Sequence, residues 1–318
     1  MREVLLHGDG LALAAASSLL HRAGWQVSWQ SNPRPKLPFV LLNAASQRLI
    51  RDIFGGAALA ALPSITRRIV RWGGETRELP HAGLVAPEEV LFRAPAGAPG
   101  TASTPAYELR TIPAAMRSVG RLTASSATFR LRANAATDAC WVEAVPHGWL
   151  FAVMVEPGQA ALLGVGEELA VLLSESALIA PLIDALQPSA QRFAAHPRLA
   201  ETLYGPGWLA CGGGALAFDP ICGEGVGHAL REAILASAIL RADAAQPDWP
   251  QLAELYAGRL RAGFRRHLEQ CLTLYSTGGD GPFWRDHCAA LVAALREIPT
   301  GTGGEQRYRL VNFDLVPR

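Results

Sequence analysis

Residues 207–240 read GWLACGGGALAFDPICGEGVGHALREAILASAIL. The apolar start of this segment predicts a strand, and six glycines then lie on the two sides of an Asp219-Pro220 corner. The Ala- and Leu-rich residues after Gly225 predict a long helix. Bare backbone around the corner suits a flat or phosphorylated ligand, and the N–H groups of a helix start favour negative charge. This segment, termed the clasp, therefore predicts a cofactor site.

A second glycine turn lies near the N-terminus. Residues 3–30 predict a strand, a helix and a second strand, with Gly8 and Gly10 at the first strand-to-helix turn. A dinucleotide pyrophosphate would rest on the helix start there. Leu13 stands where a GxGxxG motif has its third glycine, and Gln30 stands where it has an acidic ribose ligand. Gln30 can still hydrogen-bond a ribose hydroxyl, without a charge.

The two segments together resemble the FAD-dependent monooxygenases and oxidoreductases of the p-hydroxybenzoate hydroxylase fold, including the flavin halogenase-like branch. In that family a segment of the form G-D-A-A-H-x-x-x-P-x-x-G-x-G precedes a helix that faces the flavin ring. The resemblance implies FAD contacts at Gly8, Gly10, Leu13, Gln30, Arg48, Gly212, Asp219, Pro220, Gly223, Gly225 and Val226. Gly213 departs from the family, because it stands where the family has the Asp that binds the ribitol.

The resemblance also implies an α/β fold with three parts. Residues 1–62 and 205–245 would form a Rossmann-like FAD-binding domain. Residues 63–204 would form an inserted antiparallel-sheet substrate domain, and residues 246–318 the C-terminal helices and tail.

Local patterns predict the elements of the middle and C-terminal parts. Alternating apolar residues predict strands at 66–72, 77–85, 141–145, 149–155 and 160–165. Helical periodicity predicts helices at 168–186, 189–203, 249–276 and 282–298. A loop is predicted at 94–106, which is rich in Ala, Pro, Gly, Ser and Thr.

Composition excludes several classes of partner. A formal net charge of +1 and a pI near 7.7 give no electrostatic reason to bind nucleic acid. No apolar run approaches the ~20 residues that span a bilayer. Five cysteines without a CxxC pair and no secretory signal favour a reduced, cytoplasmic location.

Two groups of reactive side chains have simple structural interpretations. His267 and Cys271 are four residues apart on one helix face, and because that face is apolar we interpret them as core packing and predict no metal site. Cys222 lies in the clasp near a helix start, where a thiol pKa falls, so redox activity stays open beside its interpretation as a small apolar filler. No catalytic residue can be assigned.

The favoured function is that of an FAD-dependent oxidoreductase. We expect monooxygenase-like hydroxylation of a small aromatic molecule or of a side chain of a partner protein, with NAD(P)H or a flavin reductase as electron source. The helix start Pro282-Phe283-Trp284 is similar to that of some cofactor-maturing flavoproteins. Halogenation is disfavoured, since no WxWxIP motif is present.

Two other functions remain open. Leu13, Gln30 and Gly213 together would suit a flavoprotein-fold accessory protein with weak or no FAD binding. A flavin-dependent saturating reductase on the same fold would need a long apolar tunnel.

Overall fold

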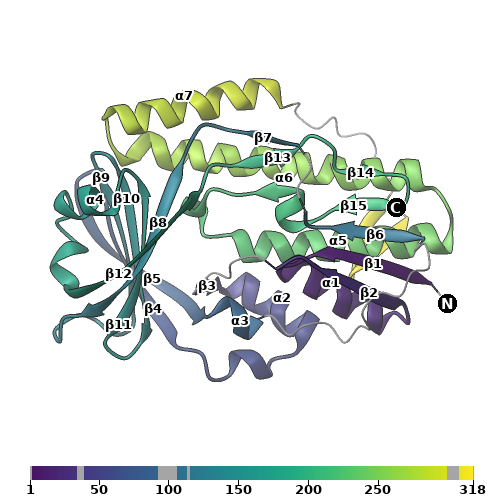
Figure 1. Cartoon of the computed structure of the whole chain (residues 1–318), viewed down its shortest axis with the longest axis horizontal. Coiled ribbons are helices and arrows are strands. Elements are labelled where there is room, and N and C mark those ends of the chain that lie inside the picture. Colours follow the sequence, from purple (N-terminus) through teal and green to yellow (C-terminus); the bar gives the residue numbers. More distant parts are fainter. Residues whose placement is uncertain (1, 34–38, 92–105, 113–114, 299–307, 318) are drawn as a thin grey trace.

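The computed structural model describes residues 2–33, 39–91, 106–112, 115–298 and 308–317 (Figure 1). Nearly all of the predicted loop at 94–106 lies outside these residues. The α-helices of the described residues are α1 (Leu11–Arg22), α2 (Ala44–Phe54), α3 (Glu88–Leu91), α4 (Leu169–Ser174), α5 (Gly225–Ala245), α6 (Trp249–Gly278) and α7 (Pro282–Glu297). Short 3-10 helices are η1 (Ala57–Leu59), η2 (Ala180–Leu182), η3 (Gly212–Gly214) and η4 (Pro220–Cys222).

A mainly parallel sheet is assembled from separate parts of the chain. In the described residues its strands are β1 (Glu3–Gly8), β2 (Gln26–Ser31), β6 (Tyr107–Arg110), β14 (Tyr204–Gly205) and β15 (Trp208–Ala210). Their order is β14-β15-β6-β1-β2, with β1 parallel to β2 and β6, and β15 parallel to β6. The carboxyl ends of β1, β6 and β15 therefore meet at one edge of the sheet, termed the carboxyl edge.

The predicted strand-helix-strand unit at residues 3–30 is confirmed. Val4 and Leu6 are buried and their neighbours less so, because successive side chains of a strand point to opposite faces. Helix α1 consists largely of Ala and Leu and packs against α5. The helix predicted after Gly225 begins at that residue and runs without a break to Ala245.

The second sheet is large and mainly antiparallel. In the described residues its strands are β3 (Val40–Asn43), β4 (Ser64–Trp72), β5 (Glu75–Ala86), β8 (Thr123–Leu131), β9 (Ala139–Val145), β10 (Gly148–Glu156), β11 (Gln159–Gly166) and β12 (Ile183–Ala194). The order is β12-β8-β11-β10-β9-β4-β5-β3, and only the β4–β9 pair among these is parallel. Gly73 and Gly74 have φ of 62° and 86° and form the predicted β4–β5 hairpin turn.

Two helix predictions in this region are wrong. Residues 168–186 hold the short helix α4, and most of residues 183–203 is extended as β12 and a further strand, β13 (Arg198–Ala200). Strand β12 pairs antiparallel with β8 from Ile183 opposite Leu131 to Ala194 opposite Thr123. The local apolar spacing favours a helix, but pairing with the distant strand β8 makes this segment extended.

The sheets do not follow the predicted domain boundaries strictly. Strand β6 lies within residues 63–204 but pairs with β1 in the parallel sheet. Strand β3 lies within residues 1–62 but pairs with β5 in the large sheet. The chain thus passes between the two sheets more often than the division supposes, and the three-part domain organisation stays a prediction.

The C-terminal helices lie along one side of both sheets (Figure 1). Tyr256 of α6 donates a hydrogen bond to Ala210 O at 2.7 Å, in the parallel sheet. Trp72 of the large sheet donates to Leu274 O of α6 at 3.2 Å. Helices α6 and α7 correspond to the predictions at 249–276 and 282–298, and α6 connects the two sheets.

The remaining strands are short. They are β7 (Met116–Ser118), β13 and β16 (Leu216–Ala217) in a small sheet, and β17 (Tyr308–Val311) with β18 (Asp314–Pro317) in a C-terminal hairpin. No helix in the described part of the chain is long and apolar enough to cross a membrane.

Candidate cofactor-binding site

The carboxyl edge brings the two glycine turns together around Thr111, the residue after β6. Thr111 N donates a hydrogen bond to His7 O at 2.9 Å. A Cβ added at Gly8 would collide with Thr111 Oγ1, and one added at Gly214 would lie 2.7 Å from the Thr111 carbonyl carbon. Glycine is therefore required at both positions for the turns to pack on Thr111.

Hydrogen bonds of Thr111 and of the Asp9 carboxylate hold the N-terminal turn in place. Thr111 Oγ1 donates to Asp9 O at 2.8 Å and accepts from Asp9 N at 2.9 Å. Gly8 and Gly10 have φ of 123° and 120°, which other residues rarely adopt. Asp9 Oδ1 accepts a hydrogen bond from Gly10 N at 2.7 Å, so a carboxylate already uses one N–H at the start of α1.

Three predicted site residues on the N-terminal part have different surroundings. Leu13 is fully buried in the core, so its side chain does not face a ligand. Gln30 is exposed and lies opposite His7 near the end of β2, close to the carboxyl edge. Arg48 is exposed on α2, a helix that contacts α1 and α5.

The glycine triplet of η3 lies between α1 and α5. Gly212 has a φ of 54°, and a Cβ there would lie 3.0 Å from Ala12 Cβ of α1. Gly212 N donates to Glu232 Oε2 of α5 at 2.7 Å, and burial raises the pKa of Glu232 to about 8. Gly213 is different, because a Cβ added there would meet nothing within 4 Å.

Asp219 holds the corner of the clasp in place. Its Oδ1 accepts from Ile221 N at 2.9 Å, and its Oδ2 accepts from the Tyr275 hydroxyl at 2.9 Å. Tyr275 in turn accepts from Trp149 Nε1 of the large sheet at 3.2 Å. Asp219 is only 3% exposed, and burial raises its pKa to about 7. Its carboxylate positions Pro220, and an FAD contact of this side chain stays a prediction.

The start of α5 is bare and faces open space. Gly223 has a φ of 63°, and Cβ atoms added at Gly223 or Gly225 would meet nothing within 4 Å. No side chain caps this end of the helix, and Val226 in its first turn is half-buried. The unsatisfied N–H groups of a 21-residue helix favour negative charge at this point.

His228 lies in the first turn of α5 as a neutral side chain. Its ring stacks on Phe218 with centroids 4.0 Å apart. Burial, followed by Arg231, lowers the pKa of His228 to about 4. The 3.3 Å contact between His228 Nε2 and Glu224 Oε2 is therefore not an ion pair at neutral pH.

These residues fit the backbone-facing part of a dinucleotide cofactor. Open space beside Gly213, Gly223 and Gly225 leaves room for a flat ring system, and two helix starts face the carboxyl edge. The acids expected at Gln30 and Gly213 are absent. The fold is that of an α/β protein, and the geometry of these residues is compatible with a dinucleotide-type cofactor.

Comparisons with solved structures identify the fold. QhpG, a peptidyl tryptophan dihydroxylase essential for tryptophylquinone cofactor biogenesis, is 18% identical with a TM-score of 0.76, over 99% of this chain and 86% of QhpG. CmlS, a flavin-dependent halogenase, is 14% identical with a TM-score of 0.78, over 93% of this chain and 70% of CmlS. A variant of HpxO from Klebsiella pneumoniae complexed with FAD is 13% identical with a TM-score of 0.69, over 93% of this chain and 95% of HpxO.

The chain therefore has the fold of the FAD-dependent hydroxylases and halogenases, and the predicted fold class is confirmed. A scan against protein-family models finds no match, and a search of curated proteins finds no significant one.

Sequence reasoning missed three residues that shape the site. Thr111 follows a short strand that no pattern predicts. Tyr275 lies on α6, 56 residues after Asp219, and nothing in the sequence marks the two residues as partners. Glu232 did carry a signal, since it is an acid among the Ala and Leu residues of α5.

Proposed function

We propose that the protein is an FAD-dependent oxidoreductase of the monooxygenase type, which hydroxylates an aromatic ring. The observation that carries this proposal is the meeting of the two glycine turns at the carboxyl edge, with open space beside Gly213, Gly223 and Gly225. The shared fold with FAD-dependent hydroxylases supports the choice of cofactor.

Each turn would have its own part in holding FAD. The start of α1 at Gly10 would receive the pyrophosphate, with Gln30 hydrogen-bonding a ribose hydroxyl. The start of α5 at Gly225 would stabilise negative charge on the pyrimidine edge of the ring. FAD, when bound, supplies the redox chemistry and the reaction with oxygen. The chain itself binds, orients and excludes water.

A cavity near the clasp suits an aromatic substrate. It has a volume of about 440 Å³ and is lined by Gln47 of α2 and by residues 64–66 and 80–84 of the large sheet. Ser46, next to the lining residue Gln47, packs on the start of α5, since its Oγ would lie 3.1 Å from a Cβ added at Gly227, so helix α2 connects the cavity wall to the clasp. A volume of this order accommodates a small aromatic ring system. We place the substrate ring here.

His81 is the candidate base in this cavity. Its Nε2 lies 3.2 Å from Arg68 NH2, which can only donate, so Nε2 accepts and the ring is neutral. Burial and Arg68 lower its pKa, which keeps the imidazole neutral at pH 7. Nε2 holds the only lone pair of the neutral ring, so a substrate phenol would displace Arg68 from Nε2 when it passes its proton to His81.

The substrate class narrows to a protein side chain by analogy. QhpG acts on a peptidyl tryptophan, and its structure covers 99% of this chain. The cavity opens at the surface of the large sheet, which suits a ring carried on a polypeptide. A free aromatic molecule remains the other candidate substrate.

The test is oxygen transfer by the FAD-loaded protein. Tryptophan- and tyrosine-containing peptides and free aromatics are incubated with the loaded protein, NAD(P)H and a flavin reductase, and product masses are measured. We expect a mass gain of oxygen atoms on a peptide, at least tenfold slower for His81→Gln and unchanged for His21→Gln on the exposed end of α1. Flavin oxidation without any oxygenated product would contradict the proposal.

One observation favours an accessory role as the second candidate. Asp9 Oδ1 already occupies Gly10 N–H, and the acids expected at Gln30 and Gly213 are absent. An accessory protein would keep the fold and bind a partner without holding FAD. Flavin retention separates the two functions, and the saturating reductase stays a hypothesis.

A further inference from the structure

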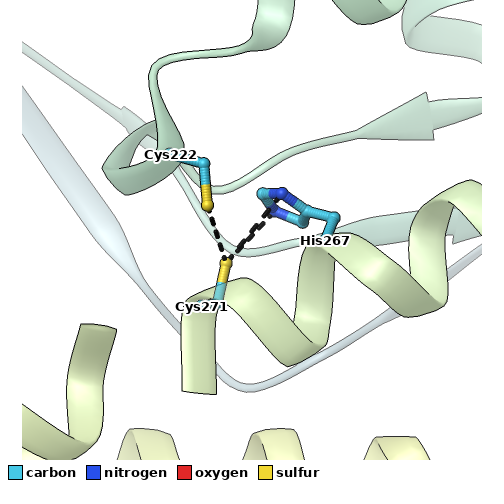
Figure 2. A group of neighbouring side chains, drawn as sticks. All are labelled: Cys222, His267 and Cys271. Atoms are coloured by element: carbon cyan, nitrogen blue, oxygen red, sulfur yellow. Dashed lines mark hydrogen bonds between the residues drawn. The ribbon is translucent and has the colours of Figure 1, made fainter. Parts of the chain in front are cut away.

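Three side chains of metal-binding type converge under the Asp219-Pro220 corner. Cys222 comes from the end of η4, and His267 and Cys271 come from α6, with Cys222 and His267 both directed at the Cys271 sulfur (Figure 2). Cys271 Sγ lies 3.7 Å from Cys222 Sγ and 3.3 Å from His267 Nε2. One ligand atom from each residue lies within 4.8 Å of the other two. The spacing of His267 and Cys271 alone predicts packing, and the distant Cys222 turns the pair into a ligand set.

We propose that Cys222, His267 and Cys271 bind a Zn²⁺ ion, with water or an exogenous ligand in the fourth position. Tetrahedral Zn²⁺ with Zn–S bonds of ~2.3 Å and Zn–N bonds of ~2.05 Å holds two sulfurs about 3.8 Å apart, and a sulfur and a nitrogen about 3.6 Å apart. The separations of 3.7 Å and 3.3 Å around Cys271 are close to these values. The third separation, between the Cys222 and His267 ligand atoms, is within 4.8 Å and has to shorten by side-chain rotation when the ion binds.

His267 has the form that a metal ion binds. Its Nε2 accepts a hydrogen bond from Asp219 N at 2.9 Å, so the ring proton is on Nδ1 and the lone pair on Nε2. A metal ion would take this lone pair from Asp219 N, because a metal–imidazole bond is much stronger than a neutral hydrogen bond.

The thiols suit a metal ion better than a disulfide. The Cys222 and Cys271 sulfurs are 3.7 Å apart, well beyond the ~2.05 Å of an S–S bond and close to the separation that tetrahedral Zn²⁺ imposes. A divalent ion also balances the charge of two thiolates. Zn²⁺ displaces the two thiol protons into solvent, and the resulting pair of thiolates around Zn²⁺ is neutral overall, as a buried site favours.

The surroundings of the site give the ion access from solvent and a structural role. Cys271 and His267 are buried, whereas Cys222 is half-buried and opens the site toward solvent. A bound ion would tie η4 to α6 immediately before Gly223, where the clasp turns into α5. This site stands on the three ligands and does not depend on FAD binding.

The test uses Co²⁺ as a spectroscopic probe on the reduced, chelator-treated full chain without flavin. We expect one Co²⁺ per chain, with the absorption of a tetrahedral thiolate complex, and displacement of Co²⁺ by Zn²⁺. Cys222→Ser and Cys271→Ser should each weaken Co²⁺ binding at least tenfold. Cys288→Ser, at a half-buried cysteine of α7, is the matched control and should bind as the unchanged chain does.

Several results would overturn the proposal. They are no Co²⁺ uptake by the reduced chain, unchanged uptake by Cys222→Ser, and a Cys222–Cys271 disulfide in the oxidised protein with no uptake after reduction. Cys222→Ser changes a half-buried position, so it stays informative where Cys271→Ser does not fold. Because the titration contains no flavin, its outcome is separate from that of the proposed function.

Discussion

The Tyr275 hydroxyl donates a hydrogen bond to Asp219 Oδ2 at 2.9 Å and links helix α6 to the corner of the clasp. The same hydroxyl accepts from Trp149 Nε1 of the large sheet at 3.2 Å. All three side chains are nearly inaccessible to solvent. One buried oxygen thus connects the large sheet, the C-terminal helices and the turn that precedes α5.

Replacing Tyr275 by Phe should destabilise the fold. The change leaves Asp219 Oδ2 and Trp149 Nε1 without a partner, and a buried unsatisfied group costs about 1–3 kcal/mol. Chemical denaturation measures the loss. Tyr204→Phe is the control, because the Tyr204 hydroxyl bonds Glu254 at the surface and its removal should change the free energy of unfolding by less than about 0.5 kcal/mol. Equal effects of the two changes would contradict the buried linkage.

Introducing an acid at Gly213 should strengthen FAD binding. Gly213 stands where the resembling family has its ribitol-binding Asp, and a Cβ there meets nothing within 4 Å. A hydrogen bond to a charged group contributes roughly 1.5–3 kcal/mol, so Gly213→Asp should lower the FAD dissociation constant about tenfold or more. Fluorescence titration checks this. Gly258→Asp on α6, also in open space, should leave the constant unchanged.

The stability of the fold should fall between pH 6.5 and 8. Burial raises the pKa of Glu232 from 4.5 to about 8, so above pH 4.5 the unfolded chain loses a proton that the folded chain keeps. Unfolding becomes easier as pH rises, until the folded carboxyl also ionises. Burial also raises the pKa of Asp219, to about 7, so Asp219 adds a slope of the same sign that ends near pH 7 and is shared by chains with or without Glu232. His228 and His267 have lowered pKa values and act in the opposite sense, but only below about pH 6.5.

Glu232→Gln isolates this effect, since the amide oxygen still accepts from Gly212 N. The slope contributed by one proton is at most about 1.36 kcal/mol per pH unit, and it should disappear in the variant. Denaturant midpoints measured from pH 6.5 to 8 test this. Glu254→Gln at the surface should retain the slope, and a flat profile in the unchanged chain would contradict the raised pKa.

Gly8→Ala should be more harmful than Gly24→Ala. Both glycines have a positive φ, of 123° and 79°, so both changes strain the backbone. Only at Gly8 would the added Cβ also displace the Thr111 hydroxyl from its bonds to Asp9. We expect Gly8→Ala to lower the thermal midpoint further than Gly24→Ala does, because its additional loss of unfolding free energy is on the order of 1–3 kcal/mol. Similar midpoints would show that Thr111 does not support the turn.

The local part of the fold could be predicted from the sequence. The glycine turns and the unit at residues 3–30 depend on short-range geometry and apolar period, and the hairpin at Gly73-Gly74 on turn chemistry. Strand β12 was beyond this reasoning, because its conformation is set by pairing with β8 and not by its own apolar spacing. Periodicity cannot show such a partner.

The site shows the same division. Gly213, Gly223 and Gly225 could be identified because bare backbone is visible in the sequence. Thr111 and Tyr275 could not, since their importance comes from hydrogen bonds to segments far along the chain. The contact of Cys222 with His267 and Cys271 likewise depends on the tertiary fold. From the sequence alone, only the spacing of His267 and Cys271, one helical turn apart, can be recognised.

Flavin retention tests the central claim most directly. The unchanged chain, Gly225→Val and Gly258→Val are incubated with excess FAD and desalted, and their visible spectra are recorded. We predict flavin absorbance in the unchanged chain and in Gly258→Val, and its loss in Gly225→Val, where a side chain fills the open space before α5. A colourless unchanged chain, or equal retention by Gly225→Val, would contradict the assignment of the clasp as the FAD site.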